Sequence, residues 1–145
     1  MRKVTHLFLM VITITALAAC SGPKELSKSP GAIQGDWTLT SMGGDEVSAD
    51  NAYTLSFNTD GTVAGLAGCN YVVAGQYDAQ EEGMVSLSSF ASTKINCESS
   101  SMDSNYASAV ESVDSYEVRN GNVMVLNSGS SSEMMFSKVM TEEEN

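Results

Sequence analysis

The sequence predicts a small, mostly β domain with one α-helix, of class α+β. Several short segments alternate apolar and polar residues with a period of two, which is typical of half-buried strands. One segment instead repeats its apolar residues with helical spacing. The chain has 145 residues, which is enough for a single modest hydrophobic core. We therefore expect one domain rather than several.

The N-terminus has the pattern of an export signal. Arg2 and Lys3 precede an apolar stretch, residues 7–17, that is too short to span a bilayer. It ends in Leu17-Ala-Ala-Cys20, which resembles the lipobox of bacterial lipoproteins. The resemblance implies that residues 1–19 are a lipoprotein signal peptide and that Cys20 is diacylated. An ordinary secretory signal that happens to precede a cysteine is the alternative.

The residues after Cys20 indicate where the domain sits. Two acyl chains anchor a protein stably to a membrane. Ser21 follows the cysteine, and the lipoprotein resemblance then favours the outer membrane, with the protein facing the periplasm. Residues 20–34 are small, polar and interrupted by Pro23 and Pro30, which predicts a flexible tether. We expect a lipid-anchored protein of the cell envelope.

Charge and histidine content exclude several function classes. Without Arg2 and Lys3 the chain keeps 5 basic residues against 18 acidic ones, so its net charge is −13. Such a surface repels nucleic acid and anionic headgroups. The only histidine, His6, lies in the signal peptide. We therefore expect no histidine-based enzyme, no metal and no cofactor. An enzyme using carboxylates, Asp60 with Glu81 or Glu82, is a weaker hypothesis.

Two cysteines remain after lipidation of Cys20. Cys69 and Cys97 form an even pair in an oxidising compartment, which predicts one structural disulfide. Closing this loop would stabilise the fold by about 3–4 kcal/mol on the chain-entropy model. The alternative, two free or metal-binding thiols, lacks further cysteine or histidine ligands.

The domain is expected to begin near Gly35 and to open with strands. Trp37 and Leu39 alternate with threonines, which predicts a first strand. Residues 43–51 are expected to form a polar loop, and residues 53–57 are the clearest strand pattern in the chain. A turn at Gly61 leads to a partner strand at residues 62–66, so a hairpin is predicted.

Further strands and one helix follow. Residues 71–77 and 84–87 are predicted strands. Met102, Tyr106, Ala109, Val110 and Val113 lie on one face of a predicted helix that Ser99, Ser100 or Ser101 would cap. Asp103 suits the helix dipole in the first turn.

The C-terminal part is predicted to consist of strands. A strand starting at Tyr116 and Val118 would turn at Asn120-Gly121, a pair that favours a type I′ hairpin, into residues 123–126. Residues 134–139 form the last predicted strand. Residues 141–145 are expected to be an acidic disordered tail.

The stretch from Gly65 to Tyr77 is the candidate site. Gly65 and Gly68 remove side chains from a strand, which marks a bend or a close approach of the backbone. A binding motif near the disulfide is the functional hypothesis. The structural alternative is that glycine and asparagine shape a bend that the cysteines hold. The candidate binding residues are Gly68, Asn70, Tyr71, Tyr77 and Thr93.

These motifs resemble the META domain of small bacterial lipoproteins. The shared features are Trp37, the strand 53–57, Gly68-Cys-Asn70 and Thr93-Lys-Ile-Asn-Cys97, and the resemblance covers residues 36–138. It implies a small antiparallel β-barrel or curved sheet with one helix packed against it, here residues 35–140. The family has an acidic residue just before the helix aromatic, where this chain has Asn105.

The resemblance also sets expectations for function. Its members are envelope proteins linked to stress tolerance, drug resistance or virulence, and no catalytic residues carry over. We expect a non-catalytic, monomeric module that binds an envelope protein or has a structural role. The alternative is a small carrier of apolar ligands, which requires an apolar interior cavity of about 300 Å³ or more.

Overall fold

The computed structural model describes residues 25–48, 53–68, 70–93, 101–129 and 132–140. Of residues 70–74, 92, 93 and 132 it describes the backbone only. Cys20, Cys69 and Cys97 lie outside the described residues, as do the signal peptide and the tail 141–145. Lipidation, the disulfide and the disordered tail therefore stay predictions.

The described residues form an antiparallel sheet of eleven strands and one α-helix. A short 3₁₀ turn, η1 (Glu81–Gly83), connects β6 to β7. The helix is α1 (Ser101–Glu111). The strands are β1 (Leu26–Ser27), β2 (Gly35–Met42), β3 (Asp45–Glu46), β4 (Tyr53–Phe57), β5 (Thr62–Ala67), β6 (Asn70–Ala79), β7 (Val85–Ser88), β8 (Ala91–Thr93), β9 (Val113–Arg119), β10 (Val123–Ser128) and β11 (Ser132–Lys138).

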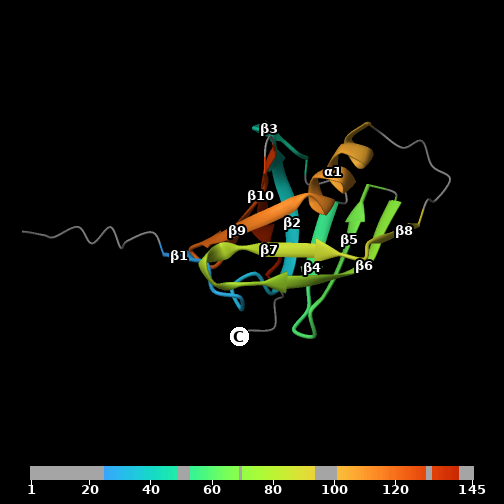
Figure 1. Ribbon diagram of the computed structural model, residues 1–145. Coiled ribbons are helices and arrows are strands. Elements are labelled where there is room, and N and C mark those ends of the chain that lie inside the picture. Colours follow the sequence, from blue (N-terminus) through green and yellow to red (C-terminus); the bar gives the residue numbers. More distant parts are fainter. Residues whose placement is uncertain (1–24, 49–52, 69, 94–100, 130–131, 141–145) are drawn as a thin grey trace, which may run out of the picture.

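The sheet curls until its two ends approach each other (Figure 1). The strand order is β1-β9-β10-β11-β2-β4-β5-β6-β7, with β3 paired to β2 and β8 paired to β6. An isolated bridge between Met84 and Ser115 then brings the start of β7 back to β9. The helix α1 packs against β5 and β7 and covers one end of this half-barrel. The predicted fold class, mostly β with one helix on a curved sheet, is confirmed.

Local sequence signals account for the hairpins. β4 pairs with β5 from Tyr53 opposite Ala67 to Phe57 opposite Val63, as the alternation predicts. Asn120 and Gly121 both have positive φ, 53° and 70°, which a type I′ turn requires at its two central residues. The predicted polar loop 43–51 differs in detail, because Gly43 and Gly44 form a tight turn that lets β3 pair with β2.

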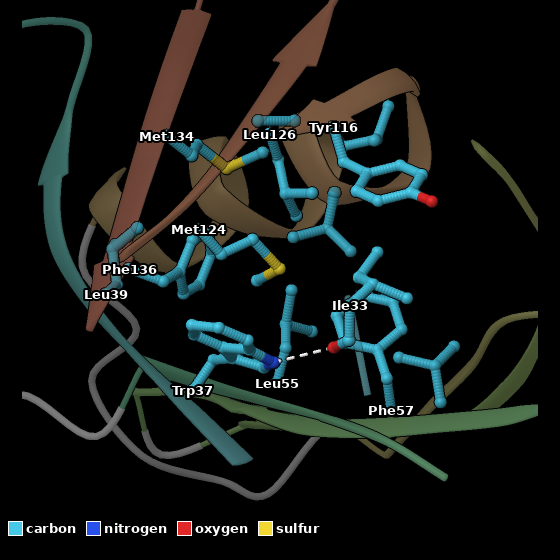
Figure 2. Close-up of a cluster of buried hydrophobic side chains, with 14 of the residues drawn as sticks. Ile33, Trp37, Leu39, Leu55, Phe57, Tyr116, Met124, Leu126, Met134 and Phe136 are labelled. Carbon is cyan, nitrogen blue, oxygen red and sulfur yellow. Dashed lines mark hydrogen bonds between the residues drawn. The ribbon is translucent and has the colours of Figure 1, made fainter. Parts of the chain in front are cut away.

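The core fills the inside of the curled sheet (Figure 2). Its largest members have side chains that are almost wholly inaccessible to solvent, and they come from strands on both sides of the curl as well as from α1. Among them are Trp37, Leu39, Leu55, Tyr106, Tyr116, Met124, Leu126, Met134 and Phe136. Burial of such side chains contributes about 1.5–3 kcal/mol each.

The chain is folded well before Gly35, which corrects the predicted tether of residues 20–34. Leu26 and Ser27 pair with β9, and Ile33 has 0% of its surface exposed. The indole Nε1 of Trp37 donates a hydrogen bond of 2.7 Å to the carbonyl of Ile33 (Figure 2). The residues from Leu26 onward are therefore part of the folded domain rather than of a tether. Within the described residues, no helix is both long and apolar enough to cross a bilayer.

Candidate functional site at the helix end of the half-barrel

A buried carboxylate lies where α1 meets the sheet. Asp103, in the first turn of α1, has only 6% of its surface exposed. The hydroxyl of Tyr53, at the start of β4, donates a hydrogen bond of 2.6 Å to its Oδ1. A bond of this length to a carboxylate is at the strong end for protein side chains. It connects α1 to β4, two elements separated by 50 positions in the sequence.

Gly68 makes room for this carboxylate. It follows β5 directly, and a Cβ atom at this position would lie 2.4 Å from Oδ1 of Asp103. Its φ of +61° is in the left-handed region, which glycine adopts at little cost. Both the backbone turn and the close approach of Asp103 therefore require glycine here.

Tyr106 completes the cluster one turn after Asp103. Its ring packs edge-on against Tyr53, with ring centroids 5.2 Å apart. Its hydroxyl donates a hydrogen bond of 3.2 Å to the carbonyl of Thr54. Burial, and secondarily the neighbouring Tyr53, raises the pKa of Tyr106 far above its usual value. We refer to Asp103, Tyr53, Tyr106 and Gly68 as the carboxylate cluster.

The contacts of the carboxylate cluster are those of a structural connection between the helix and the sheet. The carboxylate is nearly closed to solvent and accepts a hydrogen bond from a tyrosine that is itself buried. Within the described residues, every buried side-chain nitrogen or oxygen has a partner. Among the residues that the structure describes, no three or more acidic, histidine or cysteine side chains lie close enough together to hold a metal ion. The cluster holds α1 against β4 and the end of β5.

The structure places the predicted motif residues in three different surroundings. Gly68 contacts the carboxylate cluster. Tyr71 of β6 lies opposite Thr93 of β8, and Asn70 lies opposite Ala67 in the β5–β6 pairing. Tyr77 lies six residues after Tyr71 on β6, which at the usual rise of a strand places it about 20 Å away. Its hydroxyl donates to the carbonyl of Asn58, in the β4–β5 turn. The predicted grouping therefore does not include Tyr77.

Sequence reasoning missed Asp103 and Tyr53 as members of a site. From the sequence, the helix dipole is a sufficient reason for Asp103, and the apolar face of a strand is a sufficient reason for Tyr53. The available signal was the spacing: Asp103 is three residues before Tyr106, so both lie on the buried face of α1. Asn105, which replaces the acidic residue expected from the resemblance, is exposed.

The family model of the META domain matches residues 31–141. The chain belongs to the META-domain family. A solved structure with a similar fold is the NMR structure of a protein from Burkholderia xenovorans, at 20% sequence identity and a TM-score of 0.61. That match covers 95% of this chain and 99% of the other. At this identity the likeness concerns the fold alone. No curated protein matches the chain.

Two open hollows on the surface of this META domain are lined by described residues. One has a volume of about 370 Å³ and lies among β1, the β9–β10 turn and Lys138. The other, of about 250 Å³, lies between Met84 and Val113 on the seam of β7 and β9. Both open to solvent at the surface, whereas the carrier hypothesis requires an apolar cavity inside the sheet.

The carboxylates of the weaker enzyme hypothesis lie in different turns. Asp60 is exposed in the β4–β5 turn, where the hydroxyl and the amide of Thr62 donate to its carboxylate at 2.6 and 2.9 Å. These hydrogen bonds lower the pKa of Asp60. Glu81 and Glu82 are exposed in the β6–β7 turn. No contact between Asp60 and either glutamate supports a catalytic pair.

The raised pKa of Tyr106 predicts the response of the META domain to alkali. The unfolded tyrosine ionises near pH 10, whereas the folded one stays protonated. The contribution of Tyr106 to the free energy of unfolding is therefore fully present below pH 10, and it is lost as the pH rises above 10. Tyr106→Phe should flatten this fall, at a cost of about 0.5–1.5 kcal/mol at neutral pH for the lost hydrogen bond. Urea unfolding at pH 7 and at pH 11 measures both effects, and an equal fall in the variant would contradict the assignment.

Proposed function

We propose that the mature protein is a non-catalytic lipoprotein of the cell envelope, attached through Cys20 to the outer membrane, with the META domain as a binding or structural module in envelope stress tolerance. The lipobox-like sequence before Cys20 supports the anchor. Residue 25 is already part of the folded chain or directly adjacent to it, so the domain would lie against the membrane rather than on a long tether.

The observation that carries the module hypothesis is the filled interior of the curled sheet. Trp37, Tyr116, Phe136 and their neighbours occupy the space in which a carrier would hold its ligand. The buried polar groups of the carboxylate cluster are hydrogen-bonded, Tyr53 to Asp103 and Tyr106 to the backbone carbonyl of Thr54. Both features favour a rigid body that acts through its outer surface, and no observation favours the carrier alternative.

Fatty-acid labelling in a bacterial host tests the anchor. The full chain is expressed in the presence of an alkyne analogue of palmitate, and the mass of the mature protein is measured. We expect label on the chain and loss of residues 1–19, and no label on Cys20→Ser. The matched control is the double variant Cys69→Ser/Cys97→Ser, which keeps Cys20 and should be labelled.

The same experiment separates the two interpretations of the N-terminus. An ordinary secretory signal would give a cleaved chain with an unmodified Cys20, and this result would overturn the anchor. Ser21→Asp provides a further arm, because the lipoprotein resemblance associates aspartate at this position with inner-membrane retention. We expect the labelled protein to move from the outer to the inner membrane in a density gradient.

A further inference from the structure

The 370 Å³ hollow lies at the end of the half-barrel opposite α1. We call it the β1 hollow; its polar lining consists of Glu25, Ser27, Ser29, Asn120 and Lys138. Its volume is within the range of small-molecule sites in proteins. Gly31 and Gly121 also line it, and a Cβ atom at either position would meet no atom within 4 Å. A side chain at either position would therefore have open space around its Cβ atom.

Lys138 is one of the lining residues, and its ammonium group lies over an aromatic ring. Its Nζ lies 5.3 Å from the centre of the Trp37 ring, which is a cation–π distance. The side chain passes over Gly35, where a Cβ atom would lie 3.1 Å from Cε of Lys138. Lys138 is half-buried, and it makes no ion pair with any described residue. In a chain with 18 acidic side chains, such a lysine is available for an external anion.

Hydroxyl and amide groups supplement this charge. The hydroxyl oxygens of Ser27 and Ser29 lie 3.2 Å apart, so one can donate to the other while the second hydrogen stays available to a ligand. Asn120 is a further polar residue of the same lining. An ammonium with three donors, together with hydroxyls and an amide, suits an oxyanion with several acceptor oxygens.

Glu25 gives the β1 hollow a second, opposite charge. Its backbone carbonyl accepts a hydrogen bond of 2.7 Å from the amide of Asn120, which fixes the backbone at the rim. Its side chain is exposed and is in no ion pair with described residues. A ligand with only negative charge would be repelled by Glu25, whereas a ligand with an ammonium group would be attracted.

We propose that the β1 hollow binds a small zwitterion, with its phosphate-type oxyanion at Lys138 and the serine hydroxyls and its ammonium group at Glu25. The ligand chemistry is that of phosphoethanolamine, either as a free molecule or as a lipid headgroup. The headgroup source rests on the proposed function. Glu25 is five residues from Cys20, and five residues span at most about 18 Å, so an anchored domain would hold the hollow close to the bilayer.

The test uses the mature chain, residues 20–145, with Cys20→Ser to keep it unacylated. Titration with O-phosphoethanolamine, inorganic phosphate or ethanolamine is followed by the NMR shifts of the Asn120 and Gly121 amides. We expect O-phosphoethanolamine to bind more tightly than either single-charge probe. Lys138→Gln should raise its Kd about tenfold, as for loss of one charge-assisted hydrogen bond. Glu25→Gln should weaken O-phosphoethanolamine but not inorganic phosphate.

Two further variants control for diffuse charge and for misfolding. Lys28→Gln removes the same charge outside the β1 hollow and should leave the Kd unchanged. Gly31→Gln places a long side chain at a lining position with ordinary backbone φ and open space, and we expect it to block the hollow and abolish binding with an unchanged thermal midpoint. Equal effects of Lys28→Gln and Lys138→Gln, binding that survives in Gly31→Gln, or no shift with any probe would each overturn the proposal.

Vesicles distinguish the two sources of the ligand. Cosedimentation of the unacylated chain with phosphatidylethanolamine vesicles, lost in Gly31→Gln, identifies a lipid headgroup. Binding of free O-phosphoethanolamine without cosedimentation identifies a soluble ligand. Neither result depends on acylation of Cys20, so a failure of the proposed anchor and a failure of this site give different outcomes.

Discussion

Replacing Trp37 by alanine is expected to lower the free energy of unfolding by about 3–5 kcal/mol, the usual cost of removing a large buried aromatic side chain. Trp37 is fully buried in the centre of the core, and its Nε1 is hydrogen-bonded to Ile33. Both the cavity and the lost bond would loosen residues 25–34, which join the sheet through β1 and Ile33. Urea unfolding followed by circular dichroism measures the change.

Trp37→Phe separates the two contributions. Phenylalanine keeps much of the buried ring but leaves the carbonyl of Ile33 without its donor, at a cost of about 1–3 kcal/mol. Limited proteolysis provides a second readout, because we expect cleavage within residues 25–34 to become faster in both variants. If Trp37→Ala cost less than 1 kcal/mol, Trp37 would not be the centre of the core that the structure describes.

Local patterns were sufficient to predict most of the sheet. The strand at Tyr53–Phe57, the turn at Asn120-Gly121 and the buried face of α1 follow from period-two alternation, positive φ and helical spacing. Each of these signals acts over a few residues, so the sequence carries it without knowledge of the fold. Closure of the curl is different, because nothing local to Met84 or to Ser115 indicates that the two residues pair.

The N-terminal segment shows where composition fails. Residues 25–34 contain two serines together with Pro30 and Gly31, which is typical of a linker. Distant contacts fold them: β1 pairs with β9, more than 90 positions away. The indole of Trp37, only four positions after Ile33, adds a hydrogen bond to the carbonyl of Ile33. Tyr116 adds a hydrogen bond of 3.0 Å to the carbonyl of Lys28. Pairing over about 90 positions cannot be read from the segment itself.

The carboxylate cluster escaped prediction for a related reason. An acid in the first turn of a helix has a sufficient local explanation in the helix dipole, so nothing in the sequence required Asp103 to be buried. Its burial depends on the hydroxyl of Tyr53 and on the missing side chain of Gly68, both distant in sequence. The glycine was predicted to shape a bend, and it does so while also admitting the carboxylate.

The two ends of the half-barrel differ in how their polar groups are paired. At one end the paired groups of the carboxylate cluster fix α1 to the sheet. At the other end, near the proposed anchor, the lining of the β1 hollow carries a lysine and a glutamate in no ion pair with described residues. If the domain acts through its surface as proposed, it needs a rigid helix end and accessible charges at the β1 hollow.

The rigidity of the helix end can be tested at Gly68. Alanine there would have to adopt a φ of +61°, at about 1–2 kcal/mol, and its Cβ would overlap Oδ1 of Asp103. The carboxylate cannot simply move away, because it is buried and held by Tyr53. With about 1–3 kcal/mol for overpacking, we expect Gly68→Ala to cost about 2–5 kcal/mol in urea unfolding.

Gly43→Ala is the matched control, because Gly43 has almost the same φ, +63°, with no atom within 4 Å of the added Cβ. It should cost only the backbone contribution of about 1–2 kcal/mol. In an Asp103→Ala background the overlap disappears, so the cost of Gly68→Ala should fall to that of Gly43→Ala. If Gly68→Ala and Gly43→Ala instead lowered the free energy of unfolding equally in the unmodified chain, the carboxylate of Asp103 would not lie in contact with Gly68.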